Sequence, residues 1–71
     1  MDYSAYLSDD QKKDILKQRL TQFAAEAYQH GINKGVAQAA GNEAGVQAAD
    51  EALAILDSAI KYHEDELAKL G

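Results

Sequence analysis

The side chains best suited to chemistry in this sequence are two histidines and the acids that follow one of them. His63 and Glu66 are three residues apart, which places them on one face of a helix. Carboxylate-rich metal sites in helical bundles put the glutamate before the histidine and add carboxylates from facing helices. Neither condition is met. Folding the two predicted helices back on each other also keeps His30 far from His63. We therefore expect no metal site and no cofactor.

Nucleophilic catalysis has no better support. Ser8 is explained as a helix cap, and Ser58 stands on a helix face between Asp57 and an alanine. The glycine pairs 31/35 and 41/45 are spaced four apart but lack the Gly-Lys-Ser/Thr ending of a phosphate-binding loop. We interpret the glycines as sites of close backbone approach and a turn, and we expect the chain not to be an enzyme.

The composition indicates a single small domain with little core volume. The chain has 71 residues, of which 46% are hydrophobic, but 14 of these are alanine. There is no cysteine, so neither disulfides nor a cysteine-based zinc site can supply stability. Oligomerisation or docking on a partner remains as the source of stability.

Charge and hydropathy exclude several classes of partner. The net charge is −5, and all of it falls within residues 42–71, which contain seven acids and two bases. The one basic cluster, within residues 12–19, is interleaved with acids, so nucleic-acid binding is disfavoured. No apolar run of about 18 residues suggests a membrane span, and the N-terminus does not resemble a secretory signal. We expect a cytoplasmic protein with no membrane partner.

The first of two long helices is predicted over about residues 8–40. Ser8 with Gln11 three residues later forms a capping-box pattern, and proline is absent throughout the chain. Gly31 and Gly35 leave two alternatives: the helix ends near Gly31 and a short third helix covers 32–40, or the helix continues to Ala40. We favour continuity, because a line of apolar residues at every fourth position crosses both glycines.

A turn at residues 41–42 precedes a second helix over about 43–70. Gly41 suits the left-handed position after a helix, and Asn42 suits the cap of the next. The second helix carries an apolar line at alternating spacings of three and four, typical of a coiled-coil seam. Its members are Val46, Ala49, Leu53, Leu56, Ile60, His63, Leu67 and Leu70. A histidine in such a line can fix register or respond to pH, or it is simply tolerated at a loose helix end.

Folding the helices back on each other pairs positions whose numbers sum to about 83. Phe23 then meets Ile60, whereas Gly31 meets Ala52 and places small residues together near the turn. The predicted fold is an all-α antiparallel hairpin over residues 8–71, preceded by an N-terminal arm over 1–7. The predicted seam consists of Leu16, Leu20, Phe23, Leu53, Leu56, Ile60, His63 and Leu67.

Several large apolar residues fall outside this seam and need cover. They form a line on the first helix, a line on the second and a group in the arm. These candidate interaction residues are Tyr3, Tyr6, Leu7, Tyr28, Ile32, Val36, Ile55 and Tyr62. A symmetric dimer, forming a four-helix bundle, would cover the two lines. The arm has two alternatives, since it can fold onto the open end of the hairpin or insert into a partner's groove.

Three segments also carry a resemblance to known sequences. Residues 18–30 (QRLTQFAAEAYQH), 41–43 (GNE) and 60–64 (IKYHE) resemble small uncharacterised helical proteins encoded by tailed bacteriophages. That group has no agreed activity and no site residues to carry over. The resemblance implies either an accessory protein that binds a larger host or phage protein, or a virion component present in many copies. It also extends the expected location to a host cytoplasm or a virion.

Overall fold

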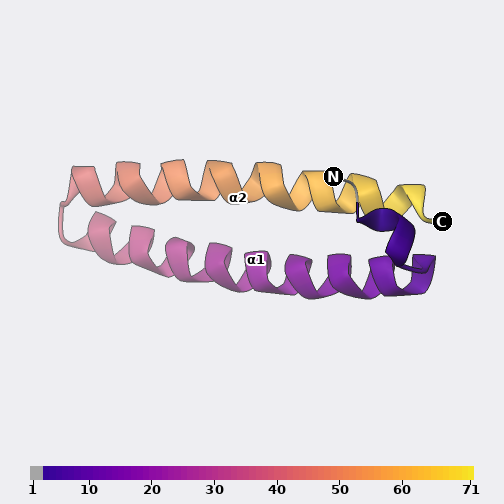
Figure 1. Ribbon diagram of the computed structural model, residues 1–71. Coiled ribbons are helices and arrows are strands. Elements are labelled where there is room, and N and C mark those ends of the chain that lie inside the picture. The colour runs from indigo at the N-terminus through magenta and orange to yellow at the C-terminus, as the bar shows by residue number, and fades with distance from the viewer. Residues whose placement is uncertain (1–2) are drawn as a thin grey trace.

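The computed structural model describes residues 3–71 as a slender helical hairpin (Figure 1). A short 3-10 helix, η1 (Ser4–Tyr6), precedes two long helices, α1 (Asp9–Ala39) and α2 (Glu43–Lys69). The long helices run antiparallel, with the turn at one end and η1 beside the last turns of α2 at the other. The molecule measures 49 × 20 × 18 Å. The predicted all-helical hairpin is confirmed, whereas Met1 and Asp2 of the predicted arm lie outside the described residues.

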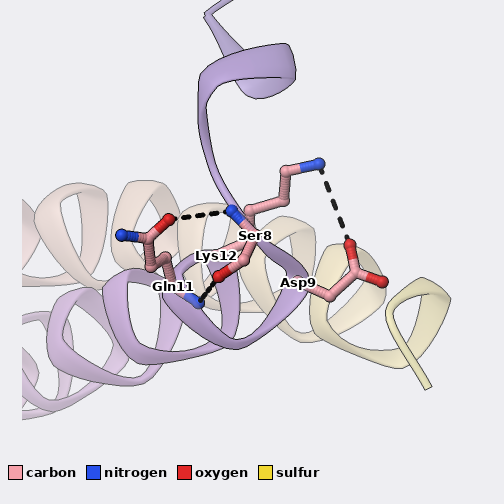
Figure 2. Close-up of polar contacts among 4 residues, drawn as sticks. All are labelled: Ser8, Asp9, Gln11 and Lys12. Carbon is pink, nitrogen blue, oxygen red and sulfur yellow. Dashed lines mark hydrogen bonds and ion pairs between the residues drawn. The ribbon is translucent and has the colours of Figure 1, made fainter.

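The start of α1 is fixed by its own side chains (Figure 2). The Gln11 backbone N–H donates to Ser8 Oγ at 3.1 Å, and the Ser8 backbone N–H donates to Gln11 Oε1 at 2.8 Å. Both halves of the predicted capping box are therefore formed. Asp9 and Asp10 add negative charge to the first turn, where the helix dipole favours it.

Helix α1 continues through both glycines, which confirms the continuous-helix prediction. The expected role of these glycines was wrong, however. Gly31 and Gly35 are exposed, and a Cβ added at either would meet nothing within 4 Å. The residues of α1 that face α2 are instead His30, Lys34 and Ala37. They continue the alternating spacing of three and four that runs through Leu20, Phe23 and Ala27.

The turn between the helices is a Schellman motif. Gly41 adopts a φ of 69°, its backbone N–H donates to Gln38 O, and the Asn42 N–H donates to Ala37 O at 2.8 Å. Asn42 Oδ1 then caps α2 by accepting from the Gly45 N–H at 3.0 Å. Close approach occurs at Gly45, where a Cβ would lie 2.7 Å from Asn42 Nδ2 and 3.0 Å from the Ala37 Cβ.

The core between the helices is thin. Leu56 is the one large side chain that is buried within residues 3–71, and Ala37 and Ala49 are buried nearer the turn. The large residues between the helices towards the open end are only half-buried, because one neighbouring helix cannot cover a leucine or phenylalanine completely, whereas it can cover an alanine. Contacts between α1 and α2 join positions whose numbers sum to between 82 and 86, close to the predicted 83.

Candidate interaction surfaces

The outer side of α1 carries the most continuous line of exposed apolar side chains. Tyr28, Ile32 and Val36 follow one another at every fourth position, and 73%, 53% and 64% of their respective surfaces are exposed. They are exposed because α2 packs on the opposite side of the helix, against Ala27, His30 and the later seam residues. An unpaired apolar line of this kind is characteristic of a surface that binds another protein.

The outer side of α2 carries a second, shorter group. Ile55 and Tyr62 are seven residues apart, so they lie about 10 Å from each other on one face. Both are mostly exposed, at 72% and 66% respectively. Exposed acids lie at both ends of this pair: Glu51 is four residues before Ile55, and Asp65 is three residues after Tyr62.

The described residues of the predicted arm differ in how exposed their side chains are. Tyr3 and Tyr6 are exposed, whereas Leu7 is half-buried beside an open hollow of about 330 Å³ at the end of the hairpin. Leu16 and Leu70 line the same hollow. The arm therefore folds onto the open end through Leu7, while its two tyrosine rings face solvent.

The predicted seam residues all lie inward on their helices. Leu56 is buried, and the other members are half-buried: Leu16, Leu20, Phe23, Leu53, Ile60, His63 and Leu67. The polar contacts within this seam could not be read from apolar spacing alone. Lys34 Nζ lies 2.7 Å from Asp50 Oδ1, which forms an ion pair across the hairpin near the turn. Continuing the alternating spacing of three and four from Ala27 would have placed Lys34 in the seam.

His63 sits in a defined polar and aromatic environment. Arg19 Nε donates to His63 Nε2 at 3.0 Å, and His63 Nδ1 lies 2.6 Å from Ala59 O. Phe23 meets the imidazole edge-on at 4.9 Å between ring centroids, and the Arg19 guanidinium lies 5.3 Å from the Phe23 centroid. Arg19 and Phe23 thus join His63 to α1, while Ala59 holds its ring within α2.

Other ionisable groups near the end of α2 are tied to each other. Lys69 Nζ donates to Glu66 Oε1 at 3.0 Å, and this hydrogen bond, with the charge of Glu66, raises the pKa of Lys69. Glu66 is therefore engaged by Lys69. No three His, Asp or Glu side chains gather closely enough to hold a metal anywhere in residues 3–71.

The two serines on the long helices have structural partners. Ser8 caps α1, and Ser58 Oγ donates to Ala54 O at 3.2 Å within α2.

Neither of the two long helices is apolar enough over a sufficient length to cross a membrane. Comparisons with protein-family models, curated proteins and solved structures found no match to this chain.

Proposed function

We propose that this chain is a small, non-enzymatic interaction protein that works by binding other proteins, including further copies of itself. One observation carries the proposal. Among residues 3–71, eight large hydrophobic side chains are exposed, whereas one, Leu56, is buried. A surface that covers the outer faces would add apolar burial that the thin core of this hairpin lacks.

The proposed larger partner is a host or phage protein, bound through the faces that carry Ile55, Tyr62 and the arm tyrosines. All four of these side chains are mostly exposed, which suits anchor residues inserting into a partner's pockets. Acids around Ile55 and Tyr62 favour a basic rim on that partner. The working location in this proposal is a host cytoplasm or a virion.

Affinity capture with matched baits tests this role. The wild-type chain is compared with an Ile55→Lys/Tyr62→Lys bait and with a control bait carrying Asp57→Lys, since Asp57 is an exposed acid of the same helix outside the face that carries Ile55 and Tyr62. The expected result is a protein enriched by the wild type and the control bait and lost with the double variant. Enrichment that is identical for all three baits, together with a chain that never self-associates, would contradict the proposal.

A second role follows from the resemblance to phage-encoded helical proteins and from the length of the exposed line on α1. In this alternative the chain is a structural component present in many copies in a phage particle. Mass spectrometry of purified particles decides between the roles. A stoichiometric amount of the chain supports the structural role, and its absence removes it.

A further inference from the structure

The outer side of α1 carries a second seam, formed by residues that the hairpin does not use. Its positions alternate spacings of four and three, as in a coiled-coil contact line. This outer seam consists of Thr21, Ala25, Tyr28, Ile32, Gly35 and Ala39, and all six residues are exposed. It lies opposite the side that packs on α2, so a third helix can reach it without disturbing the hairpin.

The outer seam is free of charge. Between Glu26 and Glu43 the only formally charged residue is Lys34, whose ammonium is held by Asp50 across the hairpin at 2.7 Å. The hydroxyl of Thr21 donates to Lys17 O within α1, so this polar group is already satisfied. The equivalent exposed line on α2, which runs through Ile55 and Tyr62, is interrupted by charged residues: Glu51, Asp65 and Lys69. Burial against another apolar helix therefore costs less on α1 than on α2.

The outer seam is also complementary to itself. We propose that two copies of this chain pair through it, with their α1 helices antiparallel about a two-fold axis near residue 30. In that register Tyr28 packs against Ile32 of the second copy, and Ala25 against its Gly35. Large side chains meet large ones and small meet small, as a symmetric interface requires.

Electrostatics favours this arrangement over pairing through α2. Residues 1–41 have balanced charge, whereas residues 42–71 carry the net charge of −5. Pairing through α1 gives a layer in the order α2, α1, α1, α2, whose two acidic helices lie about 25–30 Å apart at ordinary helix spacing. That separation exceeds the Debye length of about 8 Å at physiological ionic strength. Direct α2–α2 pairing would instead place both acidic helices about 10 Å apart.

The chain exposes more surface than a compact monomer of its mass would. The accessible surface is 5337 Å² for a mass of 7.7 kDa, whereas a compact monomer of this mass exposes about 4,300 Å². The surplus of about 1,000 Å² is comparable to the roughly 800 Å² that each partner buries in a standard stable interface. This inference rests on the proposed function, and it leaves Ile55, Tyr62 and the arm tyrosines exposed for a different protein.

Sedimentation of matched variants tests which face is used. Ile32→Lys places a charge in the centre of the outer seam, and Ile55→Lys makes the same change at an exposed isoleucine of α2. We expect the dissociation constant of the dimer to rise at least tenfold for Ile32→Lys and to stay unchanged for Ile55→Lys. The reverse pattern would overturn the α1 interface while leaving self-association, and with it the proposed function, intact. A wild type that is monomeric throughout would overturn the interface, and the capture experiment would still test the function.

Cysteine pairing tests the register, because the natural chain has no cysteine. Copies carrying Tyr28→Cys are mixed with copies carrying Ile32→Cys, and the thiols are oxidised with glutathione disulfide. Copies carrying Ile55→Cys serve as the control. We expect the mixture to form disulfide-linked heterodimers at least tenfold faster than Ile55→Cys forms homodimers. Equal rates in the mixture and the control would overturn the proposed register. This test needs no variant that removes the dimer, so it stays informative even if Ile32→Lys fails to fold.

Discussion

Arg19 donates a hydrogen bond from Nε to Nε2 of His63 at 3.0 Å, and this bond joins α1 to α2 across the open half of the hairpin. An arginine is always a donor, so Nε2 of His63 must accept. The other ring nitrogen, Nδ1, lies 2.6 Å from Ala59 O and must therefore carry the proton. These two partners assign a neutral imidazole with one defined tautomer to His63.

This geometry predicts that the hairpin loses stability when the imidazole of His63 is removed. His63→Ala takes away the acceptor at Nε2 and leaves Arg19 Nε without this bond across the hairpin. We expect a fall of about 1 kcal/mol in unfolding free energy from the lost hydrogen bond, measured by urea titration with circular dichroism.

The other histidine serves as the control. His30 is half-buried like His63, and His30→Ala should cost less unfolding free energy than His63→Ala, because the Arg19 contact remains. An equal or larger loss for His30→Ala would show that the assigned contact is not responsible.

Leu56 and Ile55 are neighbours with opposite environments. Leu56 is 7% exposed, whereas Ile55 is 72% exposed. Leu56→Ala should cost about 2–5 kcal/mol through lost burial and the cavity left behind, which is enough to unfold a hairpin of this size. Ile55→Ala should leave the melting temperature unchanged or slightly higher, because alanine is the better helix former. Thermal denaturation of both variants at one protein concentration checks this, and equal losses would show that the seam is rotated from its described position.

Gly45 and Gly31 provide a similar contrast for backbone approach. A Cβ at Gly45 would lie 2.7 Å from the capping side chain of Asn42 and 3.0 Å from Ala37, whereas a Cβ at Gly31 would meet nothing. Gly31→Ala should therefore stabilise the chain by about 1 kcal/mol. Gly45→Ala should lower the melting temperature by displacing the cap. Stabilisation by both substitutions to the same extent would show that the turn is looser than described.

The sequence predicted local features well because each is set by a few adjacent residues. The Ser8–Gln11 capping box, the turn at Gly41 and the cap at Asn42 depend on side-chain and backbone chemistry within four positions. The continuity of α1 through Gly31 and Gly35 could also be inferred, since two glycines cost about 2 kcal/mol in a helix of this length.

Rotation of α1 about its axis was harder to predict. Apolar residues recur both at alternating spacings and at every fourth position, and the two lines diverge after Leu20. The structure follows the line through His30, Lys34 and Ala37. Apolar spacing alone disfavours a lysine in such a line, but the ion pair with Asp50 satisfies the charge of Lys34. The glycines and Ile32 consequently turn outward. Apolar periodicity alone cannot decide which of these lines faces α2 when the partner of a charged residue on the other helix is unknown.

Sedimentation equilibrium of the wild-type chain, from low micromolar to about 1 mM, tests the central claim that this hairpin is completed by a second copy. The exposed line on α1 and the thin core predict a mass that rises with concentration toward about twice 7.7 kDa, with a melting temperature that rises in parallel. A single species of 7.7 kDa at every concentration, fully helical and melting at one fixed temperature, would contradict it.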